Sequence, residues 1–218
     1  MKFAYADPPY PGKARKYYGD HPDFAGEVDH AELIERLEDE FPEGWALSTS
    51  QDALRVVLAL CPAPIPRGAA GGGVRHQVRV GAYCKTSSIP PSRGPAPAAA
   101  YGWEPVIFRG GRLPSPDSPR PRDWLSTAID GYTFRGRPEK HVTGAKPPAF
   151  CRWLFECLGA EPGDEFVDLF PGSGGVLREW EAWSRAPRLA IDRPRQHSRE
   201  RQAEMRRDHP SLMPTSDL

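Results

Sequence analysis

The sequence predicts an α/β domain built on a mostly parallel sheet with helices on both faces. Short apolar segments typical of buried strands alternate along the chain with segments whose apolar residues recur at helical spacing. The chain has 218 residues, enough for one domain with a core of its own. Hydrophobic residues make up 39% and charged residues 27%, a balance typical of globular proteins.

The first half of the chain begins with an expected buried strand, Lys2–Ala6, which runs into a proline-rich turn. Asp29 and Glu32 resemble a capping box that starts a helix. One face of this helix is apolar, with Leu33, Ile34, Leu37 and Phe41. A second helix is expected to turn its apolar face inward, with Leu54, Val57, Leu58 and Cys61. Three further strands are expected, at Trp45–Thr49, Gln77–Lys85 and Trp103–Arg109.

The second half continues the alternation after a proline- and arginine-rich segment, Gly110–Arg122, which is expected to be a mobile loop. Pro147 and Pro148 suit the first turn of a helix that ends at Gly159. Its inward residues are Phe150, Trp153, Leu154 and Leu158. The domain continues with an expected strand at Glu165–Phe170 and a glycine turn. A helix follows whose inward residues are Val176, Leu177, Trp180 and Trp183, and the last expected strand is Arg188–Ile191.

Composition excludes several classes of protein. Lys and Arg together number 29, as do Asp and Glu, so the formal net charge is zero. The chain has no apolar run of about 18 residues and its first residues lack a signal-peptide layout, so a cytoplasmic protein without a membrane partner is expected. The cysteines lack CxxC spacing and are expected to be free thiols. His21, His30 and His141 lack metal-ligand spacing, so no metal site is expected.

The tetrapeptide Asp7-Pro8-Pro9-Tyr10 directly follows the first strand. The Asp7 carboxylate and the Pro8 carbonyl can both accept hydrogen bonds from one NH₂ group. Tyr10 offers a flat face on which a base can stack. The next residues interleave basic and aromatic side chains, Lys13, Arg15, Lys16, Tyr17 and Tyr18, which suits a loop that holds a nucleic-acid strand or, equally, a solvated loop.

A second segment, Asp168-Leu-Phe-Pro-Gly-Ser-Gly-Gly175, places a glycine turn between a strand and a helix. Such a turn lets a ligand approach the backbone, and the helix N-terminus favours an anionic group. Asp192 ends the next expected strand, where an acid can bind two ribose hydroxyls. The turn reads GSGG and not GxGxxG, which disfavours a nicotinamide oxidoreductase.

Together, the DPPY and DxFxGSG motifs resemble those of S-adenosylmethionine (SAM)-dependent methyltransferases that act on adenine N6 or cytosine N4. The order of the motifs, with DPPY first and the glycine turn last, resembles that of the circularly permuted beta class. The mRNA adenine methyltransferases share this order. The resemblance implies a permuted, Rossmann-like class I methyltransferase sheet of seven strands and SAM as cofactor. It implies catalytic roles for Asp7, Pro8, Pro9 and Tyr10. It implies cofactor contacts from Lys146 of the Lys-Pro signature and from Asp168, Phe170, Gly172, Ser173 and Gly174, beside Asp192.

The expected organisation is one methyltransferase domain at 1–192, with a short recognition region at about 110–143 and a basic, flexible tail at 193–218. In the family that the motifs resemble, aspartate at the head of the motif favours adenine, so the resemblance implies site-specific methylation of adenine N6 in DNA. The expected substrate contacts come from Lys13, Arg15, Lys16 and Tyr17, with further basic residues between Arg109 and Arg122. The same motifs leave open an RNA or small-molecule methyltransferase and a catalytically degenerate binding module.

Overall fold

The computed structural model describes residues 1–12, 26–63, 77–85, 102–115, 118–127 and 146–186. The chain divides into two units, Met1–Arg185 and Ala186–Leu218, and every helix and strand below belongs to the first. Several predictions fall outside these residues: the strand at 188–191, the tail at 193–218, and the side chains of Lys13, Arg15, Lys16, Tyr17 and Asp192.

The described strands form one mixed sheet in the order β5-β3-β4-β2-β1-β6. Their bounds are β1 Lys2–Ala6, β2 Gly44–Ser48, β3 Val78–Lys85, β4 Trp103–Gly110, β5 Trp124–Thr127 and β6 Glu165–Asp168. β1 pairs in parallel with β2 and β6, and β3 pairs in parallel with β5. β4 is antiparallel to both of its neighbours, β2 and β3. Five of the six strands therefore run in one direction, which confirms the mostly parallel sheet.

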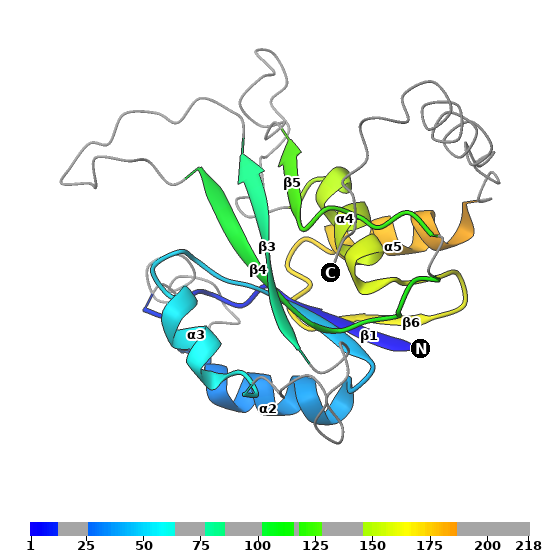
Figure 1. Cartoon of the computed structure of the whole chain (residues 1–218). Coiled ribbons are helices and arrows are strands. Elements are labelled where there is room, and N and C mark those ends of the chain that lie inside the picture. Colours follow the sequence, from blue (N-terminus) through cyan, green and yellow to red (C-terminus); the bar gives the residue numbers. More distant parts are fainter. Residues whose placement is uncertain (13–25, 64–76, 86–101, 116–117, 128–145, 187–218) are drawn as a thin grey trace, which may run out of the picture. The chain divides into compact units, whose positions relative to one another are not determined.

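Helices cover both faces of the sheet, as predicted (Figure 1). α2 (His30–Glu40) and α3 (Leu54–Leu60) lie on one face, and α4 (Pro148–Leu158) and α5 (Gly175–Arg185) lie on the other. Alternate residues of β1 divide between the two cores: Phe3 and Tyr5 pack with α4 and α5, and Ala4 and Ala6 pack with α2 and α3. No helix in the described part of the chain is long and apolar enough to cross a membrane.

Local sequence explains where α2 begins and where α4 begins and ends. The Asp29 carboxylate caps α2 by accepting hydrogen bonds from the backbone N–H groups of Ala31 and Glu32 at 2.8 and 3.2 Å. α4 starts with Pro148 in its first turn, and it ends at Gly159, whose φ of 64° is left-handed. Both ends agree with the sequence-based expectation.

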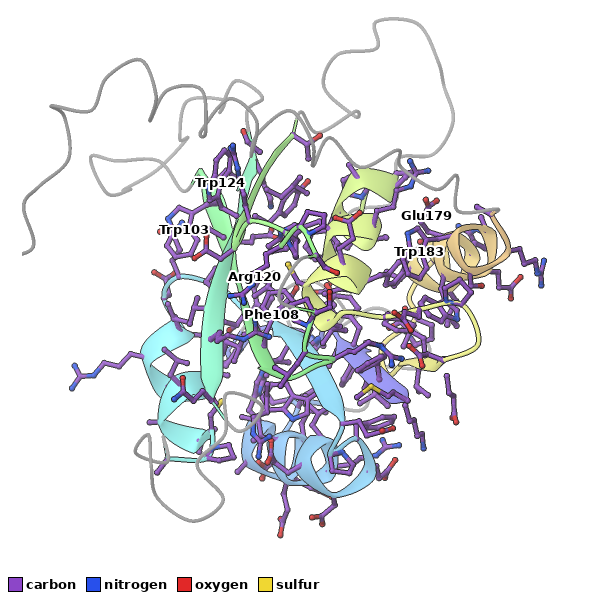
Figure 2. The ribbon with its side chains drawn as sticks, turned by 45° about the vertical axis from the view of Figure 1, so that its right-hand side comes forward. Trp103, Phe108, Arg120, Trp124, Glu179 and Trp183 are labelled. Carbon is purple, nitrogen blue, oxygen red and sulfur yellow. The ribbon has the colours of Figure 1, made fainter. Side chains whose placement is uncertain are left out.

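An aromatic cluster joins α4, α5 and β6. The Phe155 ring lies 5.0 Å from that of Phe166, 5.1 Å from that of Trp180 and 5.4 Å from that of Trp183, between ring centroids. Phe155 is fully buried. Figure 2 shows Trp183 on α5, on the side of that helix that meets α4. This cluster fixes the positions of α4 and α5, whose first turns both take part in the site described below.

The predicted mobile loop, Gly110–Arg122, makes several fixed contacts in its described part, and β5 follows it. Arg112 forms a bidentate pair with the buried carboxylate of Asp164 at 2.7 and 2.8 Å. Arg109 pairs with Glu38 at 2.8 Å and is largely buried. Each guanidinium already pairs with an acid of the folded domain, so a phosphate would have to compete with Glu38 or Asp164 for it. The composition of the segment did not reveal these distant partners.

Candidate active site

Charged side chains converge at the edge of the sheet where five strands have their carboxyl ends and the antiparallel β4 has its amino end. Asp7 directly follows β1, Asp168 is the last residue of β6 and Lys85 is the last residue of β3. Glu104 is the second residue of β4. Strand direction alone thus brings residues from distant parts of the chain to one edge, the edge at which ligands bind in open α/β sheets.

Lys146 links several of these acids. Its ammonium lies 3.0 Å from Asp7 Oδ2 and 3.3 Å from Glu104 Oε2. Lys85 makes an ion pair with the other oxygen of Glu104, so the four groups form a chain in the order Asp7, Lys146, Glu104, Lys85. The Lys146 side chain is only 8% exposed, against 21% for Asp7 and 20% for Glu104. A buried ammonium requires such partners.

The pKa values of the groups in this ion-pair chain follow from burial and from neighbouring charges of opposite sign. Burial raises the pKa of Asp7 above its ordinary value, and Lys146 opposes that rise. Burial would lower the pKa of Lys146, but nearby acidic groups, among them the Asp7 and Glu104 carboxylates, hold it well above the ordinary value. Burial also raises the pKa of Glu104, and Lys146 and Lys85 outweigh that effect and lower it. Lys146 therefore stays charged beside Asp7.

Tyr5 supports the site from below. Its hydroxyl lies 2.7 Å from the hydroxyl oxygen of Ser48, and both side chains are buried. The hydrogen bond joins the carboxyl ends of β1 and β2, two residues before Asp7 in the sequence. Burial, with a further contribution from Asp7, raises the pKa of Tyr5 well above its ordinary value, so this phenol stays neutral.

Asp168 is a second perturbed carboxylate at this edge. Burial raises its pKa from 3.8 to about 6, the backbone N–H of Phe170 lowers it by donating to Oδ1 at 3.2 Å, and Asp7 raises it further. Asp7 and Asp168, 161 positions apart in the sequence, therefore lie close enough to interact electrostatically. A carboxylate held in such surroundings is typical of a binding or catalytic site.

The Asp168 pKa leads to a prediction about stability. A carboxyl group whose pKa is raised on folding contributes stability that is present below its unfolded pKa, 3.8, and is lost as the pH rises through about 6. We expect Asp168→Asn to raise the thermal unfolding midpoint by a few degrees at about pH 8, and by about half as much at about pH 5. Differential scanning calorimetry at both pH values measures this, and equal shifts at the two would contradict it.

The glycine turn leaves an open surface between β6 and α5. Gly172 and Gly174 adopt left-handed φ values of 47° and 71°. Among the described residues, a Cβ atom on Gly172 would have only the Phe170 carbonyl oxygen within 4 Å, at 3.9 Å, so no described residue obstructs the outer side of the turn. The turn is closed by a hydrogen bond from the Gly174 N–H to the Pro171 carbonyl at 2.6 Å.

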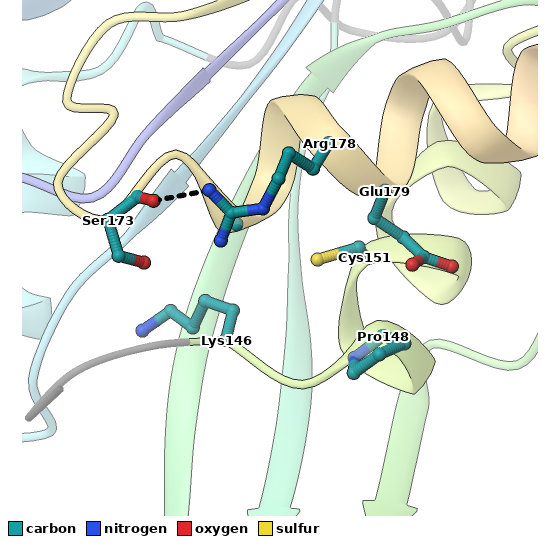
Figure 3. A pocket seen from close by; sticks show the side chains of 7 residues that line it. Lys146, Pro148, Cys151, Ser173, Arg178 and Glu179 are labelled. Atoms are coloured by element: carbon teal, nitrogen blue, oxygen red, sulfur yellow. Dashed lines mark hydrogen bonds between the residues drawn. The ribbon is translucent and has the colours of Figure 1, made fainter. Parts of the chain in front are cut away.

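A cavity of about 270 Å³ lies beside this turn (Figure 3). It is lined by residues from the first turns of α4 and α5 and from the segments before them, namely Lys146, Pro148, Cys151, Ser173, Gly175, Arg178 and Glu179. Arg178 donates to the Ser173 carbonyl at 2.7 Å, and Glu179 accepts from Arg152 at 2.7 Å. Two cationic side chains and two helix N-termini suit an anionic group, and Glu179 suits an ammonium. The cavity thus fits the amino-acid part of a zwitterionic ligand.

The structure brings together most of the predicted site residues that it describes. Lys146 touches Asp7 and lines the same cavity as Ser173, so it connects the two motifs. Pro8 is buried, and Pro9 and Tyr10 are half-buried. Sequence reasoning gave no site role to Glu104, Lys85, Arg178 or Glu179. A signal was present for two of them, because Arg178 and Glu179 fall in the first turn or so of the helix after the glycine turn.

Neither a protein-family model nor a curated protein matches this sequence. Among solved structures, the chain is similar to the M1.HpyAVI–SAM complex, with a TM-score of 0.50 and 16% sequence identity. The similarity covers 85% of this chain and 80% of that chain. At this identity the comparison concerns the fold, and it confirms the predicted fold class, a Rossmann-like α/β sheet.

Proposed function

We propose that this protein is a SAM-dependent methyltransferase that methylates the exocyclic amine of a nucleic-acid base, adenine N6 in DNA. The observation that carries the proposal is the position of Lys146. This residue contacts Asp7, which is suited to hold an amine, and it also lines the cavity at the glycine turn. An acceptor site and a cofactor site that share one residue can bring the two reacting atoms together.

The cofactor assignment rests on the cavity and on the turn. Arg178, Lys146 and the N-terminus of α5 would hold the carboxylate of SAM, and Glu179 its ammonium. Asp168, Phe170 and the glycines 172 and 174 with Ser173 would lie along the rest of the molecule. Asp192 would bind the ribose hydroxyls. The similar structure of M1.HpyAVI is a complex with SAM, which supports the same cofactor here.

The permuted order of the motifs is part of this proposal. The strand that carries DPPY, β1, comes first in the chain, and the strand that carries the glycine turn, β6, comes last among the described strands. The two strands are nevertheless direct parallel neighbours, with Tyr5 opposite Asp168. This adjacency is what a circularly permuted methyltransferase requires, since the acceptor and the cofactor meet across these two strand ends.

The mechanism follows from the chemistry of the acceptor. The lone pair of an aromatic amine is delocalised into its ring, so the nitrogen is a weak nucleophile. Hydrogen bonds from NH₂ to the Asp7 carboxylate and the Pro8 carbonyl would favour a tetrahedral nitrogen and stabilise its developing positive charge. SAM supplies an electrophilic methyl group, and the proton leaves nitrogen after transfer. The base must be extruded from a duplex or come from a single strand, and Tyr10 would stack on it.

Ligand-dependent thermal stability tests the cofactor assignment. A ligand at about 100 times its dissociation constant stabilises a folded protein by about 2.7 kcal/mol. S-adenosylhomocysteine is therefore expected to raise the unfolding midpoint of this protein, and NAD to leave it unchanged. The opposite pattern would favour a nicotinamide enzyme, and the absence of a shift with either ligand would contradict a SAM-dependent activity.

Binding to nucleic acid is predicted to depend strongly on salt. Each phosphate contact contributes roughly −0.7 to −0.9 to the slope of log K against log salt. Replacing Lys13, Arg15 and Lys16 together with Ala should flatten that slope by about two to three units. Fluorescence anisotropy with a short labelled oligonucleotide at low salt measures the effect. Since Arg109 and Arg112 are held in ion pairs, Arg109→Ala is expected to leave the slope unchanged. A wild-type affinity independent of salt would favour a small-molecule acceptor.

A further inference from the structure

Lys146 has a second feature that cofactor binding does not account for. Its ammonium is held between two carboxylates, Asp7 Oδ2 at 3.0 Å and Glu104 Oε2 at 3.3 Å. Its side chain is the least exposed of the four in the ion-pair chain. A lysine that only attracts an anionic cofactor could remain exposed to solvent. Lys146 is instead buried between two carboxylates, and we take this geometry to indicate a role in the acceptor site.

The carboxylate of Asp7 is bound asymmetrically. Lys146 pairs with Oδ2 at 3.0 Å, and no ion pair in the described ranges involves Oδ1. An ionised carboxylate whose one oxygen is fixed by a buried cation has a defined orientation, with its other oxygen left as an acceptor. That is the state that an incoming NH₂ group needs.

Glu104 has a matching role toward Lys146. It accepts from Lys146 through Oε2 and from Lys85 through Oε1, so its own orientation is fixed from both sides. Glu104 and Lys85 belong to adjacent antiparallel strands, β4 and β3, near one end of their ladder. The sheet is therefore the rigid element on which the position of Lys146, and through it that of Asp7, depends.

We propose that Glu104 and Lys146 are positioning residues for Asp7, which hold its carboxylate through Oδ2 and leave Oδ1 for the amine of the acceptor. This inference rests on the proposed function, and it adds residues and a role that the motifs do not assign. Lys85 is the outer support of the same chain.

The electrostatics of Asp7 make the proposal testable. The groups that interact electrostatically with Asp7 are Lys146, Glu104 and Lys85, together with Tyr5 on β1 and Asp168 on β6. Lys146 lowers the pKa of Asp7 and Glu104 raises it. Lys146→Met should therefore raise the Asp7 pKa, and Glu104→Gln should lower it. Two substitutions that merely damage the fold would not move this pKa in opposite directions.

The experiment is a ¹³C NMR titration of the full chain labelled at the aspartate carboxyl carbons, with the Asp7 signal assigned by its loss in Asp7→Asn. The matched control is Lys2→Met, because Lys2 lies at the other end of β1, about 17 Å from Asp7 at the usual rise per residue. The control should leave the Asp7 pKa unchanged. Lys85→Met, which removes a more exposed charge, should raise it less than Lys146→Met does and keeps the test available if Lys146→Met does not fold.

The same variants are then assayed for methyl transfer across the pH range at saturating SAM. We expect Glu104→Gln and Lys146→Met to reduce kcat by about 10- to 100-fold, as a misplaced catalytic group does. We also expect the acid limb of the profile to move with the Asp7 pKa. The inference would be overturned if the Asp7 pKa did not change in Lys146→Met and Glu104→Gln, or if it moved in the same direction in both. An acid limb of the pH–rate profile that does not move with the Asp7 pKa would also overturn it. If the variants show the expected pKa shifts but the wild-type chain transfers no methyl group, the proposed function is contradicted instead.

Discussion

Asp7→Ala is expected to reduce methyl transfer by at least about 10³-fold and to leave the affinity for SAM nearly unchanged. In the proposed mechanism the Asp7 carboxylate holds the acceptor amine, whereas the described residues that line the cavity beside the glycine turn do not include Asp7. Removing it deletes the acceptor of the amine hydrogen bond and leaves Lys146 with Glu104 alone. Radiolabelled methyl transfer gives the rate, and isothermal titration calorimetry gives the SAM affinity.

Two further variants interpret that result. Asp39→Ala removes an exposed aspartate of α2 on the surface of the domain and should leave the rate unchanged. Asp7→Asn keeps an oxygen acceptor without the charge and should lie between the wild type and Asp7→Ala. An Asp7→Ala protein that loses SAM affinity as strongly as activity would show that Asp7 binds the cofactor and not the acceptor.

Phe155→Ala is expected to lower the free energy of unfolding by about 3 to 5 kcal/mol. Phe155 is fully buried and its ring contacts three other aromatic rings, from β6 and α5. The substitution leaves a cavity between two helices and removes several edge-to-face contacts. Urea unfolding at 25 °C followed by far-UV circular dichroism measures the loss.

The control for this substitution is Val56→Ala on α3, whose side chain is 59% exposed and whose loss should change stability by no more than about 0.5 kcal/mol. If Phe155→Ala does not fold, Phe155→Leu should show a smaller loss in the same direction. A Phe155→Ala protein with nearly the stability of the wild type would mean that the aromatic cluster does not fix α4 and α5. The cavity between their first turns would then lack a rigid frame.

Periodicity was sufficient to predict most of the fold. The inward residues of α2 and α4 were assigned correctly because apolar side chains recur there at helical spacing and the helix ends carry capping residues. Strand direction was less accessible, since an antiparallel strand such as β4 has the same alternation as a parallel one. β5 was missed because it has four residues, of which Trp124 is 44% exposed, and follows a proline-rich segment.

The site was predicted where its chemistry is local in sequence and missed where it depends on tertiary contacts. Asp7 and the glycine turn stand in short motifs, each directly after a strand. The contact of Lys146 with Glu104 joins residues 42 positions apart and arises from the sheet order. For the same reason Arg109 and Arg112 resembled phosphate ligands in the sequence, although Glu38 and Asp164 neutralise them in the fold.

Methyl transfer from radiolabelled SAM to DNA and RNA, followed by identification of the labelled nucleoside, tests the central claim most directly. The substrates are single-stranded and duplex DNA and an RNA of matching sequence, with Asp7→Ala as the inactive control. The account predicts N6-methyladenosine in its deoxy form from DNA, and no label from Asp7→Ala. Label in cytosine or in RNA would change the assigned methyl acceptor but would leave the proposed reaction, methyl transfer to an exocyclic amine, in place. A protein that binds SAM but labels no nucleic acid would contradict the claim that a nucleic-acid base is the methyl acceptor.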